Sequence, residues 1–313
     1  MLFKITRCVF ILAGLISIIS CNAPAVENIY RKEGIFPSSV NAPVASVVLE
    51  WGGKVRSIGS AWLIEGGNGV LFSAKHVTDN LMNDQVELGG GECKIFLSGR
   101  VYNCVVAHIP PLRDAVVLKI SNSFDPRYLP KPYKIASTPV KVGDIVIVQG
   151  IHPHPQELID QNEKEGFRDT VVPIFRNFYE MRFGNKCVGR EEVFDTLPAV
   201  VTKLNMSVLV DDTEHDPLAE LRHKTNRYFE VRTLRNHRLS FGGLSGGVVL
   251  RLNKDSGPEA VGILTAEAPV KFEYDEDDKL TSPCGTPPSI ANTIMVTPIE
   301  SVAEEIEYAR RMK

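Results

Sequence analysis

The sequence has 313 residues, of which 43% are hydrophobic and 23% are charged, an ordinary balance for a globular protein with one large or two small domains. Its 35 basic and 38 acidic residues give a net charge of −3 at pH 7, which argues against a nucleic-acid partner. The motif HExxH does not occur, and its absence disfavours a zinc peptidase.

The N-terminus is typical of an export signal. Two basic residues, Lys4 and Arg7, precede an apolar run from Cys8 to Ile19 that is short for a bilayer-spanning helix. We therefore expect residues 1–20 to be removed as a signal peptide.

The end of this run, Ile18-Ile19-Ser20-Cys21, resembles a bacterial lipobox. The resemblance implies that Cys21 carries a lipid such as palmitate and that residues 21–44 tether the protein to an envelope membrane, on the periplasmic face of the outer membrane. The alternatives are an ordinary signal peptide that contains a cysteine, and a secreted mature protein.

Short β-rich runs separated by Gly, Pro and Asn dominate the chain from residue 45 onward, which predicts an all-β protein. The proline-rich segment 125–132 is expected to be an extended linker between two β-domains. Within the second domain we expect long loops over 151–227 and a terminal helix over 300–311, packed on that domain. The predicted strands are 46–51, 60–64, 69–73 and 115–120 in the first domain, and 144–150, 199–202, 228–231, 247–250, 260–264 and 293–296 in the second.

A disulfide is predicted from strand register. Residues 94–97 and 100–103 have the pattern of two strands joined by the two-residue turn Ser98-Gly99. If the last residue of the first strand faces the first residue of the second, Cys93 lies directly opposite Cys104, close enough for a bridge.

Two further cysteines, Cys187 and Cys284, are paired only by elimination, and a free thiol at either is the alternative. The chain contains no CxxC motif, so a zinc or redox role for the cysteines has little support.

Three patterns carry candidate catalytic residues in the order His, Asp, Ser. His76 follows the run Val-Leu-Phe-Ser-Ala-Lys, Asp114 begins the run Asp-Ala-Val-Val-Leu-Lys-Ile, and Ser245 lies in Gly-Leu-Ser-Gly-Gly. Together they resemble the trypsin-like serine proteases, in particular the bacterial stress-protease branch without its PDZ domain. The resemblance implies two antiparallel six-stranded β-barrels, over 45–132 and 133–313, and a C-terminal helix.

The same resemblance implies a monomeric serine endopeptidase that hydrolyses protein or peptide substrates through an acyl-enzyme and needs no cofactor. Ser245 would be the nucleophile, His76 the general base and Asp114 the residue that orients the imidazole. The N–H groups of Gly243 and Ser245 would form the oxyanion hole. An α/β-hydrolase is a poorer match because its chain order is Ser, Asp, His.

Leu244 stands where this family usually has Asp or Asn. This departure implies that the protein does not mature by insertion of a freed amino terminus, and it leaves an inactive scaffold that serves as a binding protein as the alternative function. The family resemblance also predicts a primary pocket for small or apolar side chains, lined by Leu239, Ser240, Leu264, Thr265 and Ala266.

Two patterns raise the question of metal binding, His152-Pro153-His154-Pro155 and the acidic segment 273–278. Solvated loop histidines are commoner than metal ligands, and acidic turns are commoner than calcium sites. No metal site is therefore expected.

Overall fold

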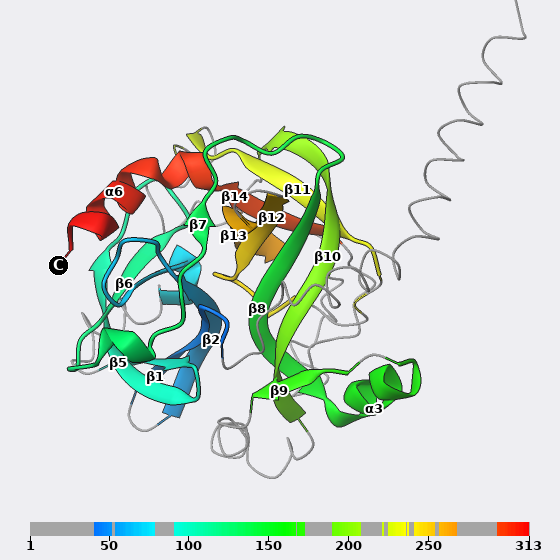
Figure 1. Cartoon of the computed structure of the whole chain (residues 1–313), viewed down its shortest axis with the longest axis horizontal. Coiled ribbons are helices and arrows are strands. Elements are labelled where there is room, and N and C mark those ends of the chain that lie inside the picture. The colour runs from blue at the N-terminus through cyan, green and yellow to red at the C-terminus, as the bar shows by residue number, and fades with distance from the viewer. Residues whose placement is uncertain are drawn as a thin grey trace, which may run out of the picture.

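A computed structural model describes residues 41–51, 54–78, 91–166, 168–172, 190–207, 221, 225–235, 237, 241–253, 257–267 and 293–312. These residues form a mostly β protein with two groups of strands, which lie side by side in Figure 1. The described part of the chain contains no helix with the length and apolar character needed to cross a bilayer. The predicted signal peptide, Cys21, Cys187, Cys284 and the acidic segment 273–278 lie outside the described residues.

The first group of strands closes into a barrel in the order β1-β2-β3-β6-β5-β4. Alternate residues along a strand point to opposite faces, and β4 accordingly alternates between residues that are buried in the barrel and residues that are not. The closed pairing leaves no free edge in this domain. The strands are β1 (Val44–Trp51), β2 (Lys54–Leu63), β3 (Val70–Ser73), β4 (Glu92–Leu97), β5 (Arg100–His108) and β6 (Val116–Ile120).

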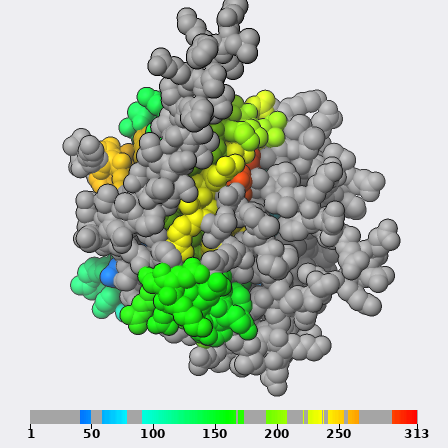
Figure 2. All heavy atoms as spheres, turned by 90° about the vertical axis from the view of Figure 1, so that its right-hand side faces the viewer, coloured from blue at the N-terminus to red at the C-terminus, as the bar shows by residue number. Residues whose placement is uncertain are grey.

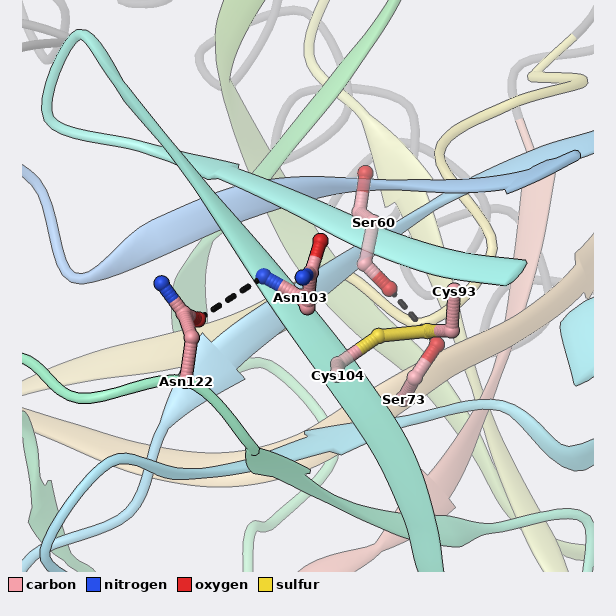
Figure 3. Close-up of a disulfide and its surroundings, with 6 residues drawn as sticks. All are labelled: Ser60, Ser73, Cys93, Asn103, Cys104 and Asn122. Carbon is pink, nitrogen blue, oxygen red and sulfur yellow. Dashed lines mark hydrogen bonds between the residues drawn. A yellow bond between two sulfur atoms is a disulfide. The ribbon is translucent and has the colours of Figure 1, made fainter.

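The predicted hairpin and its disulfide are confirmed. Ser98 and Gly99 both have positive φ, 53° and 72°, as a tight two-residue hairpin turn requires. The turn sets Cys93 opposite Cys104, and the two are disulfide-bonded with 5.1 Å between their Cα atoms (Figure 3).

The second group also forms a barrel, although two further strands lie beside it. Its sheet has the order β11-β14-β13-β12-β8-β10-β9, and an additional pairing of β10 with β11 joins six of these strands into a ring. The six strands of the ring pair antiparallel, as predicted, and the short β7, which lies outside the ring, pairs with β13 in parallel. The strands are β7 (Lys134–Ile135), β8 (Ile145–Pro155), β9 (Thr170–Val172), β10 (Arg190–Met206), β11 (Tyr228–Thr233), β12 (Val248–Asn253), β13 (Gly257–Glu267) and β14 (Thr293–Pro298).

The prediction of loops over 151–227 is wrong for much of the described part of that stretch. β8 runs on to Pro155 and pairs along its length with β10, so that both prolines of the His-Pro-His-Pro segment lie within a strand. Helix α3 (Gln156–Lys164) follows and lies at the surface of the face shown in Figure 2, in green. Loops were predicted here because proline within sheets is usually confined to edge strands or bulges.

The terminal helix contacts both barrels and not, as was predicted, the second alone: its first turn lies against β13 and β14, and its later turns lie against the first barrel. It comprises the turn η4 (Ile299–Val302) and α6 (Ala303–Arg311). Arg310 Nε donates to the carbonyl of Glu65 at 3.3 Å, and the Tyr308 ring lies 4.7 Å from that of His108. The buried side chains of Ile306 and Ala309 join a core cluster that both barrels share. In the segment between the barrels, a short turn, η1 (Pro126–Tyr128), interrupts the predicted extended linker.

Candidate active site

His76 lies in a helical turn that begins just after β3. Residues 75–78 form this turn, which Thr78 stabilises by donating from Oγ1 to the carbonyl of Lys75 at 2.9 Å. The side chain of Val77 is buried in the first barrel, and this anchors the turn. His76 itself keeps 44% of its side chain exposed, so its imidazole is accessible to a substrate.

Asp114 holds His76 through both of its carboxylate oxygens. Oδ2 lies 2.8 Å from His76 Nδ1, and Oδ1 accepts a 3.0 Å hydrogen bond from the His76 backbone N–H. Burial acts to raise the pKa of Asp114, but the charge and hydrogen bonds of His76, with the nearby charge of Lys75, hold it below its ordinary value. The carboxylate is therefore ionised near neutral pH and fixes the orientation of the imidazole.

The neighbouring Arg113 ties this acidic residue to the second barrel. Its guanidinium donates to the Asn226 side chain at 2.9 Å and to the backbone carbonyls of Thr225 and Ser301 at 3.1 and 3.2 Å. The prediction did not identify Arg113, and a single basic residue beside an aspartate offers no signal by which it could have been found.

Ser245 lies in a tight loop between Phe241 and β12. Gly243 and Gly246 adopt φ values of 96° and 84°, which side chains rarely allow. The Gly246 N–H donates to the carbonyl of Leu264 at 2.7 Å, and the Leu264 N–H donates back to Gly247 at 2.8 Å. The loop is thus fixed to β13.

The same loop is docked on the first barrel next to His76. The Ser60 N–H donates to the Ser245 carbonyl at 2.7 Å, and the Ser60 carbonyl accepts from Ser73 Oγ at 2.7 Å (Figure 3). A Cβ on Gly246 would lie 2.1 Å from the Ser60 carbonyl oxygen and 2.9 Å from the backbone nitrogen of Ala74. The structure therefore places the loop against the chain that leads directly into the His76 turn.

Ser60 connects the two barrels, a role that the sequence analysis did not predict. Its Oγ accepts a 2.8 Å hydrogen bond from the Ile151 N–H of β8 and lies 3.2 Å from the Gly243 carbonyl oxygen. Its side chain is fully buried. A serine in the middle of an apolar strand, where a valine would be ordinary, was the available signal.

Two of the residues predicted to line the primary pocket, Leu264 and Thr265, lie in β13 with described surroundings. Ser245 Oγ lies 3.4 Å from the Thr265 carbonyl oxygen, which puts the backbone of β13 beside the nucleophile. The side chain of Leu264 is buried in a core cluster. Leu239 and Ser240 lie outside the described residues, and Ala266 is described only as a backbone position in β13.

The backbone N–H groups of the nucleophile loop fall into two sets. The N–H groups of Leu244, Gly246 and Gly247 donate to backbone carbonyls, at 3.0, 2.7 and 2.8 Å. Within the described parts of the chain, no backbone or side-chain acceptor is found for the N–H groups of Gly243 and Ser245. These are the two donors predicted for the oxyanion hole.

Leu244 fills a position in the core of the second barrel. It is fully buried and packs in the cluster that contains Phe241 and Val148. Gly150 provides the space, because a Cβ there would lie 2.7 Å from Leu244 Cδ2. Leu244 therefore holds the loop by packing in the core.

A second group of titratable side chains lies behind this loop. His152, His154, Asp195 and His237 place one ligand atom each within 4.8 Å of one another. Burial raises the pKa of Asp195, but the charges of the histidines outweigh it and hold the pKa well below its ordinary value. Burial lowers the pKa of His154, but Asp195 and Asp169 outweigh it and raise the pKa to about 10. Burial dominates at His237 and lowers its pKa to about 3.

Comparison with known proteins finds similarity in structure and not in sequence. No family model matches the chain, and no curated protein matches it. It is similar to the active form of the Rv3671c protease from M. tuberculosis, with 17% identity over 86% of this chain and 81% of that one and a TM-score of 0.48. It is also similar to an inactive form of that protease, with 16% identity over 92% of this chain and 93% of the other and a TM-score of 0.47.

Proposed function

We propose that the protein is a serine endopeptidase that uses Ser245, His76 and Asp114. The observation that carries the proposal is the pairing of both Asp114 carboxylate oxygens with His76, at 2.8 and 3.0 Å, beside a docked Gly-Leu-Ser-Gly-Gly loop. An ionised carboxylate on Nδ1 fixes the tautomer in which Nε2 carries a lone pair. His76 is then prepared to take a proton from a serine hydroxyl.

The reaction follows from these roles. His76 removes the Ser245 proton as Oγ attacks the substrate carbonyl, and the N–H groups of Gly243 and Ser245 stabilise the oxyanion. The imidazolium returns the proton to the leaving amine, and an acyl-enzyme remains. Water, activated by the same His76, hydrolyses that ester.

The location and the specificity in this proposal rest on the sequence. We infer that a lipid on Cys21 anchors the enzyme to the bacterial envelope and that it acts as a monomer on protein substrates. Preference for small or apolar side chains before the cut follows from the absence of a carboxylate among residues 239–241.

A fluorophosphonate probe tests the activated nucleophile. The full-length protein should be labelled, and labelling should be lost in Ser245→Ala and His76→Ala. Matched controls are Ser121→Ala and His108→Ala, which replace residues of the first barrel outside the site and should label like the parent. A correctly folded parent that stays unlabelled would refute the proposal and favour an inactive scaffold that binds its partner without cleaving it.

A further inference from the structure

The four side chains behind the nucleophile loop converge on one point. Asp195 Oδ2 lies 2.5 Å from His152 Nε2, 3.0 Å from His154 Nε2 and 3.3 Å from His237 Nε2. His152 Nε2 also lies 2.9 Å from His154 Nε2 and 3.0 Å from His237 Nε2. Ligand atoms about 2.0–2.1 Å from a tetrahedral zinc ion are roughly 3.3 Å apart, so each of these five pairs needs to separate by less than about 1 Å to hold one. All four ligand atoms lie within 4.8 Å of one another.

Strand register brings three of the four ligands together. His152 and His154 are two residues apart in β8 and therefore point to the same face of the sheet. β10 pairs with β8 so that Val193 faces His152, and Asp195, two residues on, shares that face. His237 follows β11, and its ring lies 4.9 Å from the His152 ring.

Protons alone do not satisfy these contacts. His152 Nε2 is within 3.0 Å of an oxygen and two nitrogens, and it has at most one proton to share among them. The Nδ1 of His154 lies 3.0 Å from Asp169 Oδ2, a carboxylate that also accepts from Asn162 of α3 at 3.1 Å. In the neutral imidazole this contact directs the lone pair of Nε2 toward the centre, the arrangement found around metal-bound histidines.

The charge and the burial of the cluster match a divalent cation. The side chains are 0% exposed at His152, 1% at His154, 6% at His237 and 10% at Asp195, so an uncompensated charge there would be costly. Two carboxylates, Asp195 in the cluster and Asp169 behind His154, balance two positive charges. Three imidazoles and a carboxylate in a closed tetrahedral set are typical ligands of zinc.

We propose that His152, His154, His237 and Asp195 form a structural zinc site. The set has four protein ligands and no open position, which distinguishes it from a catalytic zinc centre. The expectation from sequence that no metal site exists rested on solvated loop histidines, whereas the two histidines lie in a buried strand.

The site lies directly beneath the nucleophile loop. A Cβ on Gly243 would lie 2.9 Å from His152 Cβ, and the His237 ring stacks on Phe241 with an interplanar angle of 5°. Phe241 in turn accepts a 3.0 Å hydrogen bond from the Leu244 N–H. We infer that the metal ion holds the Gly243–Ser245 segment in place. This second step rests on the proposed peptidase function.

Metal content is the first test. The full-length protein, purified without a histidine tag and stripped with a chelator, should take up about one zinc ion per chain, and Co²⁺ in its place should give the visible bands of a tetrahedral complex. His237→Ala should abolish the Co²⁺ bands, whereas His108→Ala, a histidine outside the cluster, should keep them. Asp169→Asn should weaken binding about 10- to 100-fold, as the loss of an outer carboxylate does.

The outcomes separate this site from the proposed function. A folded parent that takes up no zinc, or a folded His237→Ala that binds Co²⁺ as the parent does, overturns the metal site whatever the activity. If zinc binds, fluorophosphonate labelling should fall on chelation and return when zinc is restored. Labelling unchanged by chelation would overturn only the effect on the loop, and a zinc-loaded protein that never labels would refute the peptidase proposal alone.

Discussion

Gly246 allows the nucleophile loop to dock on the first barrel, and Gly246→Ala tests that contact. The new Cβ would lie 2.1 Å from the Ser60 carbonyl oxygen, 2.3 Å from Ser73 Oγ and 2.9 Å from the Ala74 nitrogen. Two of these three atoms belong to the backbone, so a side-chain rotation cannot relieve the overlap. Gly143→Ala is the matched control, because Gly143 has a similar φ of 92° but no atom within 4 Å of the added Cβ.

Both substitutions place an alanine at positive φ, but only Gly246→Ala also creates a steric overlap. An alanine at positive φ costs roughly 1–2 kcal/mol at either position. At Gly246 the overlap adds the cost of overpacking, about 1–3 kcal/mol and occasionally more. We therefore expect Gly246→Ala to lower the free energy of unfolding by about 2–5 kcal/mol and Gly143→Ala by no more than about 2 kcal/mol.

Urea unfolding and fluorophosphonate labelling measure the two consequences. Relief of the overlap must move the loop away from the chain that carries His76, so Gly246→Ala should also label much more slowly than the parent. Gly143→Ala should label at the parental rate. Equal destabilisation by the two substitutions, with labelling unchanged in both, would show that the docking contact is not rigid.

Three further predictions follow from the described contacts. The pKa of Asp114 lies below its ordinary value of 3.8, so the stability that its carboxylate contributes is complete above that pH and disappears as the pH falls through the lowered pKa. In urea unfolding, the loss of stability caused by Asp114→Asn should therefore be smaller at about pH 3 than at about pH 6. A loss that does not depend on pH would contradict the ion pair. Serine at both Cys93 and Cys104, which are 11 residues apart, should cost about 3 kcal/mol in chemical denaturation, and an unchanged midpoint would contradict this. Leu244→Ala should cost about 2–5 kcal/mol in the same assay, and a cost below about 1 kcal/mol would mean that the loop is not held by the core.

Local patterns of the sequence sufficed for much of the fold. Alternating apolar residues located the strands of both barrels, and the Ser98-Gly99 turn fixed the register that pairs Cys93 with Cys104. The pairing of His76 with Asp114 was also anticipated, because three motifs in a fixed order constrain one another. Each of these predictions depended on residues close in sequence or on a known arrangement of motifs.

Contacts between distant segments could not be anticipated in the same way. The His152 cluster depends on the pairing of β8 with β10, and two prolines in β8 made that strand resemble a loop. The prediction for the terminal helix missed its contacts with the first barrel, since an amphipathic pattern shows that a helix has a buried face but not what covers it. The polar residue Ser60 stands out in its apolar strand, but its partners come from separate strands and loops, so the sequence could not name them.

The position of Ser60 has a consequence for the timing of activity. Ser60 and Gly243, which meet at 3.2 Å, are 183 residues apart in the chain. Contacts of such long range form late in folding because a large loop must be closed first. An unfinished polypeptide that emerges from the ribosome up to residue 240 therefore has His76 and Asp114 but nothing for them to activate. On the proposed function, hydrolytic activity is withheld until the second barrel has been synthesised, which protects the nascent chain and its neighbours from premature cleavage.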